Sequence, residues 1–182
     1  MLDTLRVLLL GVFGAAMVHI SILFLLPVYS ERDVWAALAA RADLYTAVPL
    51  RHSAGGTDAE RPFIDNPLFE ASVCRFDLST GMTRIVASGR VPFWSISVYD
   101  RDGLNVFSLN DRSAQQRVLD VLVADPPQML ELRNGLPETL AQSVLVQADV
   151  TEGMALVRVF VPDESWRGAV SAFLDSMSCT PV

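Results

Sequence analysis

One uncharged run near the amino terminus constrains what this chain can fold into more than any other feature. Residues Val7 to Leu26 carry no charged side chain and are interrupted by the polar residues His19 and Ser21. An α-helix rises about 1.5 Å per residue, so a run of this length reaches roughly 30 Å, the thickness of the hydrocarbon core of a bilayer. A helix also satisfies its own backbone polar groups inside lipid. The run therefore predicts a membrane-spanning helix that contacts the lipid bilayer.

A cleaved secretory signal is the alternative interpretation of this run. The apolar part of a signal is typically about 7–15 residues long and ends in a small-x-small cleavage site. The run is longer, and Pro27, Val28 and Tyr29 follow it in place of an Ala-x-Ala site, so we expect an uncleaved anchor. Counting basic residues leaves the orientation open, because Arg6 precedes the run while Arg32 and Arg41 follow it. We expect the short amino-terminal end in the cytoplasm and the domain on the other side.

The charge balance excludes several partners and chemistries. The chain carries 21 acidic and 14 basic residues, for a net charge of −7, and every basic residue is an arginine. Nucleic acid is not an expected partner, because its backbone is bound by a basic stripe and the arginines do not cluster. The lack of lysine excludes Schiff-base and P-loop chemistry that needs an amine.

Composition and pattern divide the chain into three parts. Ser30 to Asp33 has capping-box spacing and opens an Ala-rich helix that we expect to reach about Ala42. Residues 46–67 carry Pro, Gly, Ser and single charges without apolar periodicity, which predicts a linker or surface loop. The predicted parts are a cytoplasmic end with the transmembrane helix (1–27), a juxtamembrane helix with a linker (28–67) and a β-rich domain with a C-terminal helix (68–182).

Apolar alternation predicts mostly β structure after the linker. The clearest pair of strands is Phe93 to Tyr99 and Leu104 to Asn110, joined by a turn in which Gly103 supplies a positive φ. Pairing of Tyr99 with Leu104 would place Trp94, Ile96 and Val98 on the core face. Further strands are predicted at 69–78, 83–91, 118–124, 144–148 and 155–161, a short helix after Asp125, and an amphipathic helix over 166–177 capped by Asp163.

Catalytic and metal-binding motifs are weak. His52 is the one histidine after the apolar run, and it lies in the polar linker without a nucleophile-elbow glycine pattern. The turn Asp100–Gly103 resembles the opening of a calcium loop, but Leu104 takes the next ligand position and Asp111 stands where a bidentate glutamate is needed. We therefore expect a hairpin turn there and no metal, cofactor or catalytic residue.

The second face of the predicted hairpin is the candidate binding surface. Two aromatic residues flank small hydroxyl residues on it, with polar side chains nearby. The alternative is structural burial, because β-sandwiches bury both faces of some strands. The binding candidates are Phe93, Tyr99, Arg75, Asn110 and Arg112.

Two further contacts are predicted, and each has an alternative interpretation. A bond between Cys74 and Cys179 would tie the tail to an early strand and could contribute about 4–5 kcal/mol in the chain-entropy model, whereas two separate buried thiols are the alternative. Gly11, Ala15 and His19 share one face of the apolar helix, where small residues would let a second helix approach. A neutral histidine tolerated near the interface is the alternative for that face.

Three segments carry a resemblance to a known family: VCRFDL at 73–78, PFWSISVYD at 92–100 and LNDR at 109–112. They resemble the bacterial family called domain of unknown function 1254, in a short membrane-anchored form. The second segment is also similar to the companion family numbered 1214. The resemblance implies a jelly-roll-like antiparallel β-sandwich with added helices, on an inner membrane protein facing the periplasm. It implies no established activity, and this chain has room for one of the two modules that larger relatives combine.

These expectations favour a membrane-anchored binding or accessory module of the bacterial envelope, with a companion 1214 protein or another membrane protein as partner. The alternative is a periplasmic hydrolase acting on a small molecule or envelope polymer. A hydrolase should show a water-lined cleft where several of Arg75, Asp100, Asn110 and Arg112 converge, whereas an interaction module should show an exposed apolar patch. A structural subunit held through the helix face around Gly11 is a third interpretation.

Overall fold

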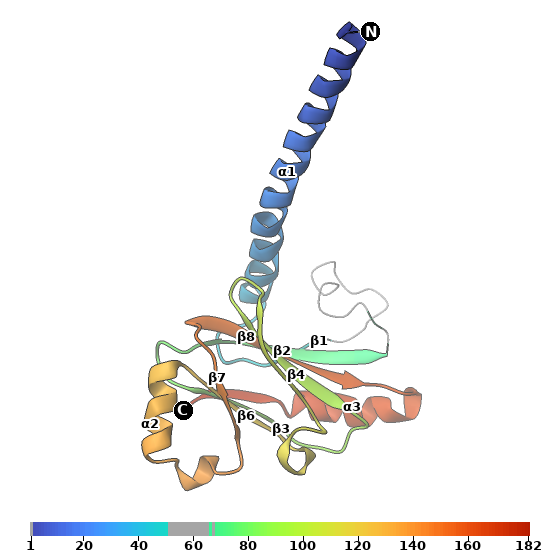
Figure 1. The fold of residues 1–182 in the computed structure, drawn as a ribbon. Helices are drawn as coiled ribbons and strands as arrows, with labels where there is room; N and C mark the ends of the chain where they lie inside the picture. Colours follow the sequence, from blue (N-terminus) through green and yellow to red (C-terminus); the bar gives the residue numbers. More distant parts are fainter. Residues whose placement is uncertain (1, 51–65, 67) are drawn as a thin grey trace.

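A long helix and a two-sheet domain make up the protein. The structure, a computed structural model, describes the backbone of residues 2–50, 66 and 68–182, and the side chains of these residues outside 27–34. Helix α1 stands away from the domain, and the amino terminus lies at its far end (Figure 1). The domain contains both sheets together with helices α2 (Pro126–Asn134) and α3 (Arg167–Asp175). His52, Phe63 and Ile64, which the sequence analysis places in the linker, lie outside the described residues.

Helix α1 (Leu2–Ala39) is continuous through the point where the sequence predicts a break. Ser30 lies inside this helix and does not open a second one. Pro27, which has no backbone N–H to donate, lies inside this helix as well. The segment Leu2–Leu26 is long and apolar enough to cross a membrane, a property that it shares with signal sequences.

The first sheet is antiparallel throughout and has the strand order β1-β2-β8-β4-β5. Strands β2 and β8 pair over their full length, from Phe69 opposite Phe160 to Asp77 opposite Glu152. Strand β1 lies in the segment that the sequence analysis assigns to the linker. The five strands are β1 (Val48–Leu50), β2 (Phe69–Asp77), β8 (Glu152–Phe160), β4 (Trp94–Asp100) and β5 (Asn105–Asn110).

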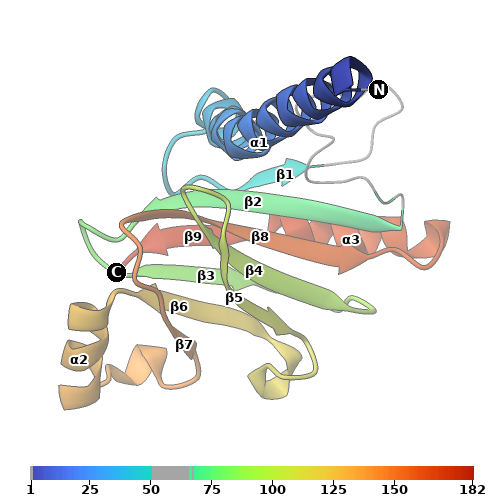
Figure 2. The same ribbon diagram turned by 45° about the horizontal axis from the view of Figure 1, so that its top comes forward.

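The second sheet has the order β7-β6-β3-β9, and β6 and β7 form the one parallel pair between its strands. Its last strand, β9, follows α3 at the end of the chain and pairs with β3 (Figure 2). The sequence analysis contains no strand at this position. The four strands are β7 (Val144–Gln147), β6 (Leu119–Ala124), β3 (Thr83–Ala87) and β9 (Ser178–Pro181).

The core lies between the two sheets. Alternate residues of each strand point inward, as the period of two requires, so that Phe76 and Ile96 of the first sheet share one buried cluster with Ile85 and Val121 of the second. Two smaller clusters lie on the outer faces. Helix α2 covers β6 through Met129 and Leu132, and the end of α1 covers the first sheet through Trp35 and Leu38. The fold is therefore an α+β sandwich with mostly antiparallel strands, as the sequence predicts.

A disulfide joins the two sheets. Cys74 of β2 and Cys179 of β9 are bonded, their Cα atoms are 6.5 Å apart, and 105 positions of sequence separate them. Both residues are buried within the core between the sheets. The last strand is consequently fastened to the opposite sheet by a covalent bond as well as to β3 by backbone pairing.

The β4–β5 hairpin has the predicted faces and one irregularity. Ile96 pairs with Leu109 and Val98 with Phe107, which places these four side chains toward the core. A bulge between Val98 and Tyr99 then shifts the register, so Tyr99 pairs with Asn105 and not with Leu104 as the sequence analysis expects. A bulge adds one unpaired residue to one strand, which the apolar pattern alone does not reveal.

Candidate functional site

A cavity of about 310 Å³ opens where the β3–β4 loop, the segment after β5 and helix α3 meet. Its size lies near the lower end of the roughly 300–1,000 Å³ that small-molecule sites occupy. The cavity combines apolar rings with polar and charged side chains. Its lining residues are Ala87, Ser88, Gly89, Arg90, Val91, Trp94, Asp111, Gln116, Arg117, Val118 and Phe173.

Asp111 is the buried acid of this cavity. Its side chain belongs to a residue that is only 6% exposed, and its Oδ1 atom has no hydrogen-bond partner. The backbone N–H of Asp111 donates to the carbonyl of Trp94 over 3.0 Å, which fixes the residue beside the floor of the cavity. A buried acceptor without a partner costs about 1–3 kcal/mol, so a structure that keeps one usually supplies a donor from water or a ligand.

Asn110 holds the chain in the bend that places Asp111. Its Oδ1 accepts hydrogen bonds from the backbone N–H groups of Arg112 and Ser113 at 3.0 and 3.3 Å. This is an Asx turn, in which a side-chain amide replaces a backbone partner directly after a strand. Asn110, a binding candidate of the sequence analysis, therefore acts here as a turn residue, and Arg112 is exposed and does not line the cavity.

The opposite wall of the cavity is a backbone turn in a rarely occupied conformation. Gln116 and Arg117 have φ of 51° and 60°, in the left-handed region that residues with a Cβ seldom adopt. The indole N–H of Trp94 donates to the carbonyl of Arg117 over 3.1 Å and helps to hold this turn. Backbone strain of this kind costs on the order of 1–3 kcal/mol per residue and is often found at functional sites.

The other predicted candidates lie elsewhere. Tyr99 packs on the outer face of the first sheet beside the end of α1, and Arg75 lies over the ring of Trp35 there. Ser95 pairs with Asn110 at the far end of β4, four residues from Tyr99, which is about 13 Å along a strand. Arg75 and Asp100 therefore lie at one end of the sheet, and Asn110 and Arg112 at the other. These four residues therefore do not all meet in one cleft.

Phe93, the remaining candidate, directly precedes β4. Its carbonyl accepts from the backbone N–H of Phe160 over 3.0 Å, and its side chain is partly buried. It does not line the cavity, although its neighbour Trp94 does. The predicted candidates Phe93, Asn110 and Arg112 are therefore neighbours of the cavity in sequence, whereas Trp94 and Asp111, which line it, were not among the candidates. The signal that could have pointed to Asp111 is the LNDR segment, in which this acid directly follows an apolar strand and a turn-forming asparagine.

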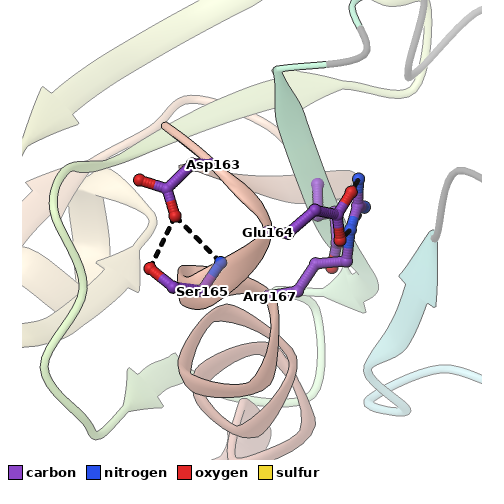
Figure 3. A network of polar contacts seen from close by, with 5 residues as sticks. Asp163, Glu164, Ser165 and Arg167 are labelled. Atoms are coloured by element: carbon purple, nitrogen blue, oxygen red, sulfur yellow. Dashed lines mark hydrogen bonds and ion pairs between the residues drawn. The ribbon is translucent and has the colours of Figure 1, made fainter.

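A second group of charged residues lies at the start of α3 (Figure 3). The Arg167 guanidinium donates to Glu164 at 2.7 and 2.8 Å and to the buried Glu70 of β2 at 3.1 Å. These hydrogen bonds raise the pKa of Arg167 and lower that of Glu164. Asp163 accepts from the hydroxyl and the backbone N–H of Ser165, which lowers the pKa of Asp163. Each of these charged groups has an internal partner. Asp163 caps the short 3-10 helix Glu164–Trp166 that leads into α3, and not α3 itself as the sequence predicts, while Arg167 fastens the start of α3 to β2.

Two other features carry no site. An open space of about 710 Å³ is lined only by residues of α1 between Arg6 and Ala16, and a single exposed helix does not enclose a cavity. Among residues 2–50, 66 and 68–182, no group of three or more His, Cys, Asp or Glu side chains is placed to hold a metal ion. Gly11, Ala15 and His19 lie on the exposed helix, and a Cβ on Gly11 would meet no atom within 4 Å.

Two solved structures share this fold. The VPA0106 protein from Vibrio parahaemolyticus matches with a TM-score of 0.58 and 12% identity, over 85% of this chain and 35% of that chain. An uncharacterised protein from Burkholderia cenocepacia matches with a TM-score of 0.52 and 14% identity, over 84% of this chain and 40% of that one. This chain therefore spans well under half of either relative, and at these identities the likeness shows the fold alone.

The family comparison agrees with the resemblance carried by the three sequence segments. No curated protein matches the chain. The family model described as protein of unknown function (DUF1254) matches residues 66–181, which include every strand of the two sheets except β1 and the whole lining of the Asp111 cavity. The chain belongs to the DUF1254 family.

Proposed function

We propose that this protein is a membrane-anchored binding or accessory module of the bacterial envelope, with its domain in the periplasm. The observation that carries the proposal is the exposure of α1. Large apolar side chains cover the helix on all sides, and Leu10 and Phe24 are 71% and 77% exposed. An apolar surface of this extent is not stable in water and marks a membrane or protein contact.

The length of the apolar segment supports a lipid contact. Leu2–Leu26 has 25 residues, which corresponds to roughly 37 Å of helix and is enough to cross the hydrocarbon core with some tilt. Beyond the segment, Trp35 and Leu38 pack on the first sheet. The apolar segment and the part that contacts the domain belong to one continuous helix, which supports an anchor that stays attached.

The disulfide supports a location outside the cytoplasm. Cys74 and Cys179 are bonded in the core, and disulfides form and persist in oxidising compartments such as the periplasm. The acidic domain carries no lysine and no arginine cluster that would favour nucleic acid. The Asp111 cavity supports a binding role for the domain over a purely structural one.

Fractionation and protease protection test this proposal together. We expect the intact protein in the membrane fraction, resistant to alkaline carbonate and released by detergent. Protease added to spheroplasts should degrade the domain, while protease added to intact cells should not. Mass spectrometry of the purified protein should find residues 2–26 still attached. Recovery of intact protein from the cytosol without detergent, or protection of the domain in spheroplasts, would contradict the proposal.

The expected partner is a second envelope protein, either a companion protein of family 1214 or a membrane protein that meets the Gly11, Ala15 and His19 face. Capture of the full-length protein from detergent-solubilised membranes, followed by identification of the proteins that copurify, tests this part. The same capture with Gly11→Ile separates partners of the helix face from partners of the domain, because only the former should be lost.

A further inference from the structure

We propose that the Asp111 cavity binds a small organic acid that also carries a hydrogen-bond donor, the chemistry of an amino acid or a hydroxy acid. This inference rests on the proposed function, because it names the ligand class of a binding module. Three observations carry it: a buried carboxylate that lacks a partner, arginines in the same lining, and two aromatic rings at the cavity wall.

The carboxylate of Asp111 selects for a donor. Asp111 is only 6% exposed, and its Oδ1 atom has no hydrogen-bond partner. The two oxygens of an aspartate exchange by rotation about χ2, a broad and roughly two-fold torsion, so either oxygen can be directed toward the cavity that the side chain lines. An ammonium or hydroxyl group is the partner that a buried carboxylate favours, since hydrogen bonds to a charged acceptor are the strong ones.

The arginines select for an acidic group. Arg90 and Arg117 both line the cavity and both residues are exposed, so their side chains can approach a ligand from the solvent side. A guanidinium binds a carboxylate through two parallel hydrogen bonds. The lining thus offers a negative group in its buried part and positive groups near the solvent, a separation that fits a ligand with a donor and an acid at different positions.

The size and the apolar wall limit the rest of the ligand. Trp94 and Phe173 are each 2% exposed and line a cavity of about 310 Å³. Short apolar groups such as a branched alkyl chain fit this wall, whereas a polymer does not enter a space of this volume. A metal ion does not fit, because Asp111 is the one acidic, histidine or cysteine residue of the lining and a divalent cation needs several such ligands.

Four compounds with the same alkyl group separate these contributions. Leucine carries both an ammonium and a carboxylate, 2-hydroxy-4-methylpentanoate a hydroxyl and a carboxylate, 4-methylpentanoate only the carboxylate and 3-methylbutylamine only the ammonium. Binding is measured on the full-length protein in detergent by calorimetry, with empty micelles as the blank. A Trp35→Phe, Trp166→Phe background leaves Trp94 as the one tryptophan, so its fluorescence reports on the cavity itself.

We expect leucine or the hydroxy acid to bind at least about tenfold more tightly than either single-group compound. Asp111→Asn should remove most of that advantage and should not weaken the affinity for 4-methylpentanoate, because it removes a negative charge from the same cavity. Arg112→Gln is the matched control, because it changes an exposed arginine next to Asp111 that does not line the cavity, and it should alter no affinity. If Asp111→Asn does not fold, the pair Arg90→Gln and Arg117→Gln should weaken the acids and leave the amine unchanged.

Three outcomes would overturn the inference. They are no saturable binding of any of the four compounds at millimolar concentration, equal affinity for all four, and affinities that Asp111→Asn, Arg90→Gln and Arg117→Gln leave unchanged. The first would mean that an ordered water alone satisfies Asp111. None of these results would alter fractionation or protease protection, and a cytosolic location would not alter calorimetry, so failure of the ligand class and failure of the anchored module are distinguishable.

Discussion

The guanidinium of Arg75 lies over the indole ring of Trp35, with its central carbon 5.1 Å from the ring centroid. Arg75 also donates to the carbonyl of Ala42 over 2.6 Å, so it contacts the end of α1 and the chain that follows it. Arg101 of the β4–β5 turn approaches the same ring at 5.8 Å. The end of α1 is therefore held against the first sheet by a stacked arginine as well as by Leu38.

Removing the Trp35 ring should loosen the end of α1. Trp35→Ala removes the ring that both arginines approach and the contact with the first sheet, and we expect this local contact to lose on the order of 1–2 kcal/mol. Hydrogen exchange should become faster at residues 36–42 and stay unchanged in the strands of the second sheet. Trp35→Phe keeps an aromatic face and should exchange nearly as the parent does. Unchanged exchange in Trp35→Ala would show that the stacking does not fasten the helix.

Reducing the disulfide should destabilise the domain by up to about 4–5 kcal/mol, because Cys74 and Cys179 close a loop across 105 positions. Thermal unfolding with and without a reductant measures the effect. The double variant Cys74→Ala, Cys179→Ala should unfold at the lower temperature and show no response to the reductant. An equal response of parent and double variant would attribute the effect to something other than this bond.

Gly153 should not tolerate a side chain. A Cβ at this position would lie 2.6 Å from Cζ of the buried Phe76 and 2.7 Å from the carbonyl oxygen of Tyr99, so Gly153→Ala forces two strands apart. We expect a loss of about 1–3 kcal/mol in the free energy of unfolding. Gly168→Ala is the matched control, because a Cβ there meets nothing within 4 Å and helix α3 should gain about 0.5–1 kcal/mol. Equal effects at the two glycines would contradict the packing argument.

The pair of Asp120 and Arg84 should make stability depend on acid pH. Burial raises the pKa of Asp120, but hydrogen bonds from Arg84 and Ser143 lower it by more, so the pKa lies below its usual value. A lowered carboxyl pKa contributes stability above the ordinary aspartate range, near pH 4, and loses it as the pH falls through the lowered pKa.

Arg84→Gln therefore tests this contribution. The variant should be less stable than the parent by on the order of 1 kcal/mol at neutral pH, and the difference should shrink as the pH falls below about 4. Unfolding curves recorded across this range measure both. Arg112→Gln removes an exposed arginine, and its stability should change with pH in the same way as that of the parent. If the stability difference between Arg84→Gln and the parent does not change with pH, then Arg84 does not act through the ionisation of Asp120.

The small-residue face of α1 should mediate helix association. Gly11→Ile places a branched side chain on the face shared by Ala15 and His19, where close approach of a second helix needs small residues. We expect self-association in a bilayer to fall, as measured by energy transfer between labelled helices. Ala16→Ile adds the same bulk about 100° away from that face and serves as the control. If Gly11→Ile leaves self-association unchanged, this face of α1 does not contact a second helix.

Local patterns in the sequence were sufficient for most of the first sheet. The β4–β5 strands and their inward faces follow from alternation around a turn with Gly103, whose φ is 85° as the turn requires. The helix at Pro126–Asn134 follows Asp125 as the sequence predicts, and Asp125 and Gln128 form a capping box at its start. Such elements are predictable because the residues that decide them lie within a few positions of one another.

Features that depend on distant pairing were not predictable in this way. Strand β9 has four residues and little apolar pattern, and it is a strand because β3 pairs with it and Cys179 bonds to Cys74. The cavity escaped prediction for the same reason, since Trp94 of β4, Asp111 and Arg117 of the segment after β5, and Phe173 of α3 are brought together only by the closed sandwich.

The position of β9 has a consequence for biogenesis. The second sheet lacks an outer strand, and the core lacks Cys179, until residue 181 has been synthesised and has reached β3. The domain therefore stays open until this segment pairs with β3, and the bond between Cys74 and Cys179 can seal it only after that pairing. Deletion of residues 178–182 should leave an unclosed domain that proteases degrade readily.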